Sequence, residues 1–292
     1  MNEYIEKLKS LDFSKSTSKD VREILVHLPI SYMSYTIQPG ILVSRARKGK
    51  GYKTAEETTY CPVEYCKQMQ RATLANDTMF YGVVSDDQSH LENARAICVS
   101  ECSSLCREGL ESVGKEYFCI SQWEIVQPIR VVSFVADDTF SKVSDNSLLN
   151  QMRNSFVLAH KNDYSRENTE VARLISSEFS KVVADSSEYL VSATIANDII
   201  HELKYDGIVY PSVQLGGQAG LNVALAPIAA DSKLKFCRVL EHGFYKKGTK
   251  SILRIERTSF AGSPFQTVND DVSDAFICQD LGISNISQLP EC

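Results

Sequence analysis

Length, composition and charge already restrict what this chain of 292 residues can be. A hydrophobic fraction of 43% is ordinary for a globular protein and allows a sizeable core. The net charge of -6 argues against nucleic acid as a partner, because non-specific binding to phosphates needs a basic surface.

The lack of a recognisable targeting signal and the number of cysteines lead us to expect a cytoplasmic protein. The N-terminal segment lacks the apolar run of a signal peptide. The longest apolar stretch, around Val223 to Ala230, contains Pro227 and is too short to span a bilayer, so we expect no membrane partner. Nine cysteines is an odd number, and we expect reduced thiols rather than a disulfide framework.

Hydrophobic periodicity and helix-breaking residues predict the elements of the first half of the chain. In chain order these are helices within 3–28 with Ser18 as the N-cap of the second, a strand over 40–46, a long loop over 48–70, a strand over 78–84, a helix over 93–110 and two strands within 116–135.

The second half continues the mixture of helices and strands. A polar break at 137–146 precedes a helical block to about 184, a helix over 189–203, a strand in GIVYPSV, a Gly-rich turn LGGQAG, and strands over 221–226, 235–240 and 250–256. The last thirty or so residues show no strong pattern. Regular βαβ alternation is missing, so we predict an α+β fold.

The Gly-rich turn is not a dinucleotide-binding loop of the Rossmann type. Gly216, Gly217 and Gly220 lie between two predicted strands, and no predicted helix follows them. That loop needs a helix N-terminus to hold the pyrophosphate, so we reject this interpretation.

Four short pieces carry candidate chemistry. They are Ser44-Arg45-Ala46-Arg47 at a strand end, Arg71-Ala72 before a strand with Phe80-Tyr81-Gly82, Glu101 in ARAICVSE, and DGIVYPS (206–212) followed by the Gly-rich turn and LNVAL (221–225).

These pieces, in this order, resemble the RES family, which is named for its Arg, Glu and Ser motif residues. The match extends diffusely from Gly40 to Leu240 and is most specific in its last piece. The chain departs from the family by having Gln70-Arg71-Ala72-Thr73 where Gly-Arg-x-Asn is usual, and by a longer segment between Tyr81 and Glu101 than compact members have.

The resemblance implies an ADP-ribosyltransferase-like mixed fold, with a helical N-terminal extension (1–39), a RES-like NAD-binding domain (40–258) and a C-terminal extension (259–292). It implies that NAD is the substrate, that no metal is needed, and that the nicotinamide–ribose bond is cleaved by hydrolysis or phosphorolysis. Family members are often toxins, so we expect a separate antitoxin or regulatory protein as a partner. Two alternatives stay open: transfer of ADP-ribose to a macromolecule, and an inactive module that binds a nucleotide or a partner.

The chemistry of this cleavage assigns a carboxylate. Breaking the bond builds positive charge on the ribose, and a nearby carboxylate stabilises it. Nicotinamide leaves as a neutral molecule and needs no general acid. We assign this role to Glu101; Glu92 is the alternative, because its spacing from Tyr81 suits compact family members.

Binding residues follow from the charges of NAD. Pyrophosphate favours the planar fork of arginine, which makes Arg45, Arg47 and Arg71 candidates. The cationic nicotinamide ring favours an aromatic face, here Tyr81. The resemblance adds Ser212 and Asn222 to the site.

Each of these residues also has a plain structural interpretation. Glu101 is a solvated helix residue, Tyr81 a core tyrosine, and Ser212 a turn residue. Arg45 and Arg47 form strand-end salt bridges in this interpretation.

The cysteines of the helix predicted over 93–110 are interpreted structurally. Cys98, Cys102 and Cys106 are spaced four apart, which places them on one helical face. A metal site would need a fourth ligand, so we favour buried structural thiols.

Overall fold

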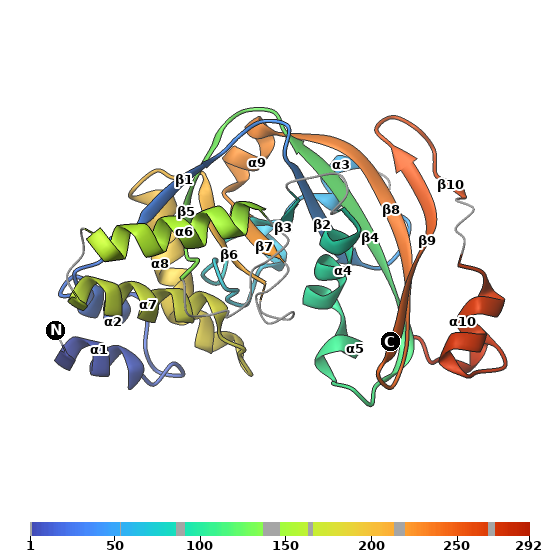
Figure 1. Ribbon diagram of the computed structural model, residues 1–292, viewed down its shortest axis with the longest axis horizontal. Coiled ribbons are helices and arrows are strands. Elements are labelled where there is room, and N and C mark those ends of the chain that lie inside the picture. Colours follow the sequence, from blue (N-terminus) through green and yellow to red (C-terminus); the bar gives the residue numbers. More distant parts are fainter. Residues whose placement is uncertain are drawn as a thin grey trace. The chain divides into compact units, whose positions relative to one another are not determined.

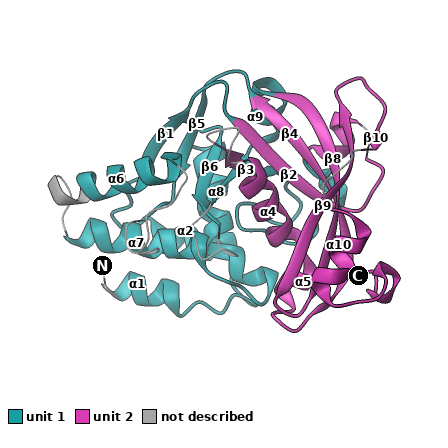
Figure 2. Cartoon of the chain, turned by 45° about the vertical axis from the view of Figure 1, so that its right-hand side comes forward, with its two compact units in different colours: residues 1–41, 60–81, 125–234 teal, residues 42–59, 82–124, 235–292 magenta. Residues whose placement is uncertain are grey.

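The computed structural model describes residues 2–52, 54–85, 91–136, 147–162, 166–212, 220–267 and 272–292. The chain forms two compact units, and each combines three separate stretches of sequence (Figure 2). Unit 1 comprises Met1–Ile41, Tyr60–Tyr81 and Ile125–Leu234, and unit 2 comprises Leu42–Thr59, Gly82–Glu124 and Lys235–Cys292. Helices and strands are mixed along the chain, which confirms the predicted α+β class.

Unit 1 contains eight described helical segments and four strands. Its helices are α1 (Asn2–Lys9), α2 (Ser18–Leu25), η1 (Val63–Tyr65), α6 (Ser147–Asn162), α7 (Arg166–Ser180), η3 (Ser186–Tyr189), α8 (Leu190–His201) and α9 (Pro227–Lys233). Its strands are β1 (Met33–Ile37), β5 (Ile129–Ser133), β6 (Gly207–Pro211) and β7 (Leu221–Leu225), in the order β1-β5-β6-β7. Only β5 and β6 pair in parallel within this set.

The core of unit 1 lies where helices pack against strands β6 and β7. Every residue of these two strands is buried, and α7 and α8 contact β6 (Figure 1). The N-terminal helices belong to the same core, since Ile5 and Val21 join its cluster of buried side chains. Helix α2 begins at Ser18, and the flanking residue is Thr17, whose backbone N–H donates to the Asp20 carboxylate over 2.7 Å. The prediction of Ser18 as the cap is therefore wrong by one residue.

Unit 2 is built mainly from antiparallel strands. Its strands are β2 (Leu42–Lys48), most of β3 (Phe80–Ser85), β4 (Val113–Ile125), β8 (Leu234–Lys247), β9 (Lys250–Phe260) and β10 (Gln266–Thr267), in the order β3-β2-β4-β8-β9-β10. Its helical segments are α3 (Ala55–Thr58), α4 (Leu91–Cys102), α5 (Ser104–Arg107), α10 (Asp274–Leu281) and η4 (Ile286–Gln288). Helix α4 packs against β2 (Figure 1).

Predicted and observed elements agree best where the sequence pattern is long and uniform. The predicted strand over 78–84 corresponds to β3, and the two strands within 116–135 are β4 and β5. The prediction that the strand in GIVYPSV ends at Pro211 is confirmed by β6. The polar break at 137–146 and most of the Gly-rich turn lie outside the described residues.

The loop predicted over 48–70 contains the short helices α3 and η1, and further elements were not predicted either; three of these have a local reason. Strand β1 is short and half polar, α9 follows β7 without a polar break, and α10 presents only two buried side chains, Ile277 and Leu281. Because those two side chains are at most 4% exposed, the C-terminal segment is packed rather than loose. The longest apolar stretch is divided between β7 and α9, and none of the described helices is long and apolar enough to cross a membrane.

Candidate functional site

A tight turn from Gln70 to Thr73 presents Arg71. The backbone N–H of Gln70 donates to the carbonyl of Thr73 over 2.9 Å, and the reverse bond measures 3.1 Å. These two bonds fix the chain direction on both sides of Arg71. The turn lies in unit 1, shortly before β3.

The Arg71 guanidinium lies in a cradle made by residues far along the chain. Its Nη2 donates to the carbonyl oxygen of Lys181 over 3.0 Å. Its Cζ lies 5.1 Å from the ring centre of Tyr189 and 5.8 Å from that of Tyr210. Two aromatic faces so close stabilise a cation through their ring quadrupoles.

One nitrogen of this guanidinium is not satisfied. The Nη1 atom of Arg71 is buried and has no hydrogen-bond partner within the described residues. A buried donor without a partner costs about 1–3 kcal/mol, which a hydrogen-bond acceptor would recover. An anionic oxygen suits it best, because charge-assisted bonds are the stronger ones. This nitrogen is the group of the cradle that a phosphate or carboxylate oxygen would satisfy.

Tyr81 supports the turn that carries Arg71. Its hydroxyl accepts from the backbone N–H of Ala72 over 3.2 Å and lies 2.9 Å from the hydroxyl of Thr73. Its half-buried ring packs against the core of unit 1. The structure thus brings Tyr81 next to the turn that carries Arg71, and the tyrosine hydroxyl anchors this turn by hydrogen bonds.

Ser212 and Asn222 lie at neighbouring positions of the β6–β7 pair. Asn222 is opposite Tyr210, whose ring contacts the Arg71 guanidinium, and Asn222 is 6% exposed. Ser212 is fully buried, and its backbone N–H donates to the carbonyl of Gly220 over 2.9 Å. The β6–β7 pair therefore connects these two predicted residues to the Arg71 cradle through Tyr210.

Arg45 and Arg47 of unit 2 have a common structural role. Arg45 Nε donates to the carbonyl oxygen of Thr59 over 3.0 Å, and Arg47 Nη1 donates to that of Glu57. Both carbonyls belong to the C-terminal end of α3, where helical carbonyls lack partners within the helix. Arg47 also lies over the ring of Tyr52, at 5.3 Å. These arginines hold α3 against β2.

The two candidate carboxylates both lie on α4 but differ in environment. The side chain of Glu92 is 87% exposed and pairs with Arg95 at 3.6 Å. Glu101 is half-buried in the last turn. The pKa of the neighbouring Cys102 thiol is raised mainly by burial; the charge of Arg45 opposes this and the charge of Glu101 adds to it.

The cysteines of α4 are structural rather than reactive. Burial, and to a smaller degree the charge of Glu101, raises the pKa of the Cys98 thiol. This thiol donates to the carbonyl of Ser44 over 3.2 Å, and the Cys102 thiol lies 3.8 Å from that of Ala46. Protonated thiols are poor nucleophiles. Across the described ranges, no group of His, Cys, Asp and Glu side chains has the arrangement of a metal site.

Sequence reasoning missed the aromatic half of the cradle. Tyr210 stands within the DGIVYPS piece, and its strand position was a usable signal. Tyr189 carries no such signal, because it becomes relevant only when η3 packs beside the turn at Arg71.

Compared with known proteins, the sequence matches no family model and no curated protein.

Proposed function

We propose that this protein consumes NAD by cleaving the bond between nicotinamide and ribose. The observation that carries the proposal is the Arg71 cradle, in which a guanidinium lies over two tyrosine rings and one of its buried nitrogens has no partner among the described residues. A pyrophosphate oxygen fits this nitrogen in charge and in hydrogen-bonding capacity. The resemblance to RES proteins supplies the reaction.

The proposed roles follow from the charges that develop during cleavage. Arg71 binds the pyrophosphate, and Tyr81 keeps the turn that carries Arg71 in place. Positive charge grows on the ribose as neutral nicotinamide leaves, and a carboxylate near the ribose stabilises it; the sequence assigns this role to Glu101. The ribosyl carbon is then attacked by water or by phosphate. This scheme needs no metal and no general acid.

The first experiment measures nicotinamide release from NAD, with and without phosphate, by chromatography. We expect release by the wild-type protein and a fall of roughly tenfold or more in kcat/KM for Arg71→Ala, since a charged hydrogen bond contributes about 1.5–3 kcal/mol. Arg71→Lys should be nearly as poor, because an ammonium cannot form the bidentate fork. Arg166→Ala, at an exposed arginine in the same unit, is the matched control.

Two outcomes contradict the proposal. If wild-type protein binds NAD but releases no nicotinamide under either condition, the chain is a nucleotide-binding module. If nicotinamide is released and Arg71→Ala behaves like Arg166→Ala, the cradle is not the pyrophosphate site.

A further inference from the structure

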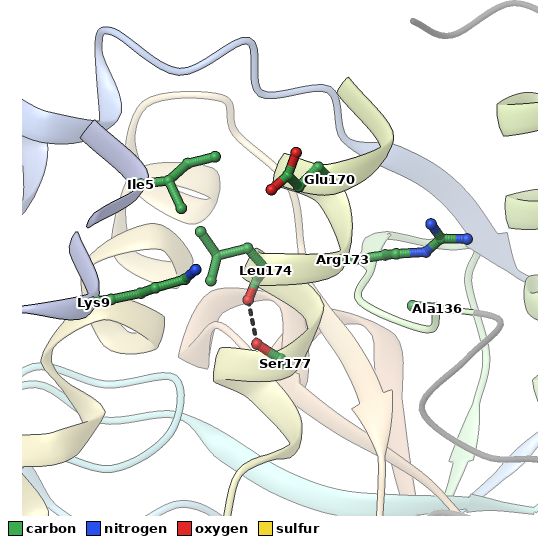
Figure 3. A pocket seen from close by; sticks show the side chains of 7 residues that line it. All are labelled: Ile5, Lys9, Ala136, Glu170, Arg173, Leu174 and Ser177. Carbon is green, nitrogen blue, oxygen red and sulfur yellow. Dashed lines mark hydrogen bonds between the residues drawn. The ribbon is translucent and has the colours of Figure 1, made fainter. Parts of the chain in front are cut away.

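Helices α1 and α7 of unit 1 line a pocket of about 410 Å³ (Figure 3). Small-molecule sites in proteins have volumes of about 300–1,000 Å³, so this pocket is large enough for a compact ligand. Its lining residues are Ile5, Lys9, Ala136, Glu170, Arg173, Leu174 and Ser177.

The floor of the pocket is apolar and firmly packed. Ile5 is 3% exposed and Ala136 is 2% exposed, while Leu174 packs against the core of unit 1. On α7 the lining residues are spaced three and four apart, which makes one helical face. A different face of α7, with Val171 and Ile175, fills the core. On the face of α7 that lines the pocket, Leu174 is the apolar residue, beside the polar Glu170, Arg173 and Ser177.

The rim of the pocket carries charged side chains of both signs. Lys9 and Arg173 are cationic, and Glu170 is the single acid among the lining residues. Figure 3 shows the ammonium of Lys9 reaching toward Leu174 from one side, while Arg173 extends on the other side, near Ala136. The Glu6 carboxylate, which is not among the lining residues, pairs with Lys9, so an entering anionic group has to compete with Glu6 for this ammonium.

Lys9 is available for exchange with a ligand. Its ammonium lies 3.1 Å from the Glu6 carboxylate, with the two side chains 52% and 71% exposed. Such exposed pairs contribute little, so a ligand anion competes readily. The Ser177 hydroxyl, in contrast, donates to the Leu174 carbonyl over 2.6 Å, so it is already engaged within the helix (Figure 3).

We propose that this pocket binds a small amphipathic anion. Its apolar body covers Ile5 and Leu174, and its carboxylate or phosphate headgroup pairs with Lys9. An apolar floor beside an exposed lysine suits this class better than neutral hydrophobic molecules or small inorganic anions. The proposal does not depend on NAD cleavage.

The test uses the full chain and three probes that share an eight-carbon tail: octanoate, octyl phosphate and octanol. We expect at least one of the two anions to bind with a dissociation constant of about 1 mM or tighter by calorimetry. Octanol should bind roughly tenfold more weakly, because it lacks the charge. Comparing octanoate with octyl phosphate identifies the preferred headgroup.

Variants assign the binding to this pocket. Lys9→Glu should weaken the binding of the anion by about tenfold or more. Lys7→Glu is the matched control, because Lys7 lies on the same helix, pairs with Glu3 at 2.6 Å and is not among the lining residues. Ser177→Phe, which fills the pocket from its rim, should abolish binding, with circular dichroism confirming that each variant is folded.

Three results would overturn the proposal. The first is the absence of binding by both anions. The second is octanol binding as tightly as the anions. The third is equal weakening by Lys7→Glu and Lys9→Glu, which would indicate a general charge effect.

Discussion

The hydroxyl groups of Tyr81 and Thr73 lie 2.9 Å apart, so the strand residue predicted to face nicotinamide holds the turn that presents Arg71. The same tyrosine oxygen accepts from the N–H of Ala72. Tyr81 thus acts on the candidate site through its hydroxyl, whether or not its ring also contacts a substrate.

Replacing Tyr81 by Phe separates these two roles. We expect Tyr81→Phe to lower the free energy of unfolding by about 1 kcal/mol and to weaken NAD binding, because the turn at Arg71 loses its anchor. Urea denaturation and NAD titration measure the two effects. Tyr65→Phe, at a tyrosine that is 72% exposed, is the control. If stability and NAD affinity are both unchanged, the Tyr81 hydroxyl contributes to neither, which contradicts its role in anchoring the turn.

The pair Glu101 and Glu92 provides a matched test on one helix. Glu101→Gln should reduce NAD turnover by roughly a hundredfold or more, as expected for the loss of an electrostatic stabiliser. Glu92→Gln should leave turnover unchanged, since that side chain is 87% exposed. Nicotinamide release measures the turnover of both variants, and thermal melting checks that they are folded. The reverse result would move the assignment to Glu92.

Replacing Arg45 by Ala tests whether this residue contributes to the stability of the fold or to the binding of NAD. Because it donates to the carbonyl of Thr59, which directly follows α3, Arg45→Ala should lower the free energy of unfolding by about 1–2 kcal/mol. Arg107 is exposed, and its two hydrogen bonds to backbone carbonyls are long, at 3.4 Å each. Arg107→Ala should therefore change the free energy of unfolding little. A loss of NAD affinity at unchanged stability would instead support a direct contact of Arg45 with pyrophosphate.

Glu116 makes the stability of unit 2 depend on pH. Burial alone would raise the pKa of this carboxyl group, yet hydrogen bonds from Lys48, Ser103 and Ser104 together hold the pKa below its ordinary value. A depressed pKa contributes stability above the unfolded value, about 4.3 for Glu, and this contribution is lost as the pH falls through the folded pKa.

Urea denaturation across the acidic range measures this effect. Wild-type stability should decline below about pH 4.3, and Glu116→Gln should show a smaller decline from a lower starting stability. Glu108→Gln, at an exposed position, should keep the wild-type profile. Identical profiles for wild type and Glu116→Gln would contradict the role of this carboxylate.

Local pattern determined much of the secondary structure and one part of the candidate site. Strand β3 follows from its run of aromatic and β-branched residues, and the end of β6 follows from Pro211, which has no N–H for the ladder. Arg71 and Tyr81 are close in sequence, so their proximity in space required little more than a turn between them.

Tertiary structure decided the partners of these residues. Tyr189 and Tyr210 stand more than a hundred positions after Arg71, and periodicity within a segment carries no information about such pairing. The binding of Arg45 and Arg47 to the carbonyls of α3 was equally hidden, because sequence shows charges but not which backbone groups lack partners. Strand β1 became a strand by pairing with β5, about a hundred residues later. Long-range packing, rather than local preference, fixed these features.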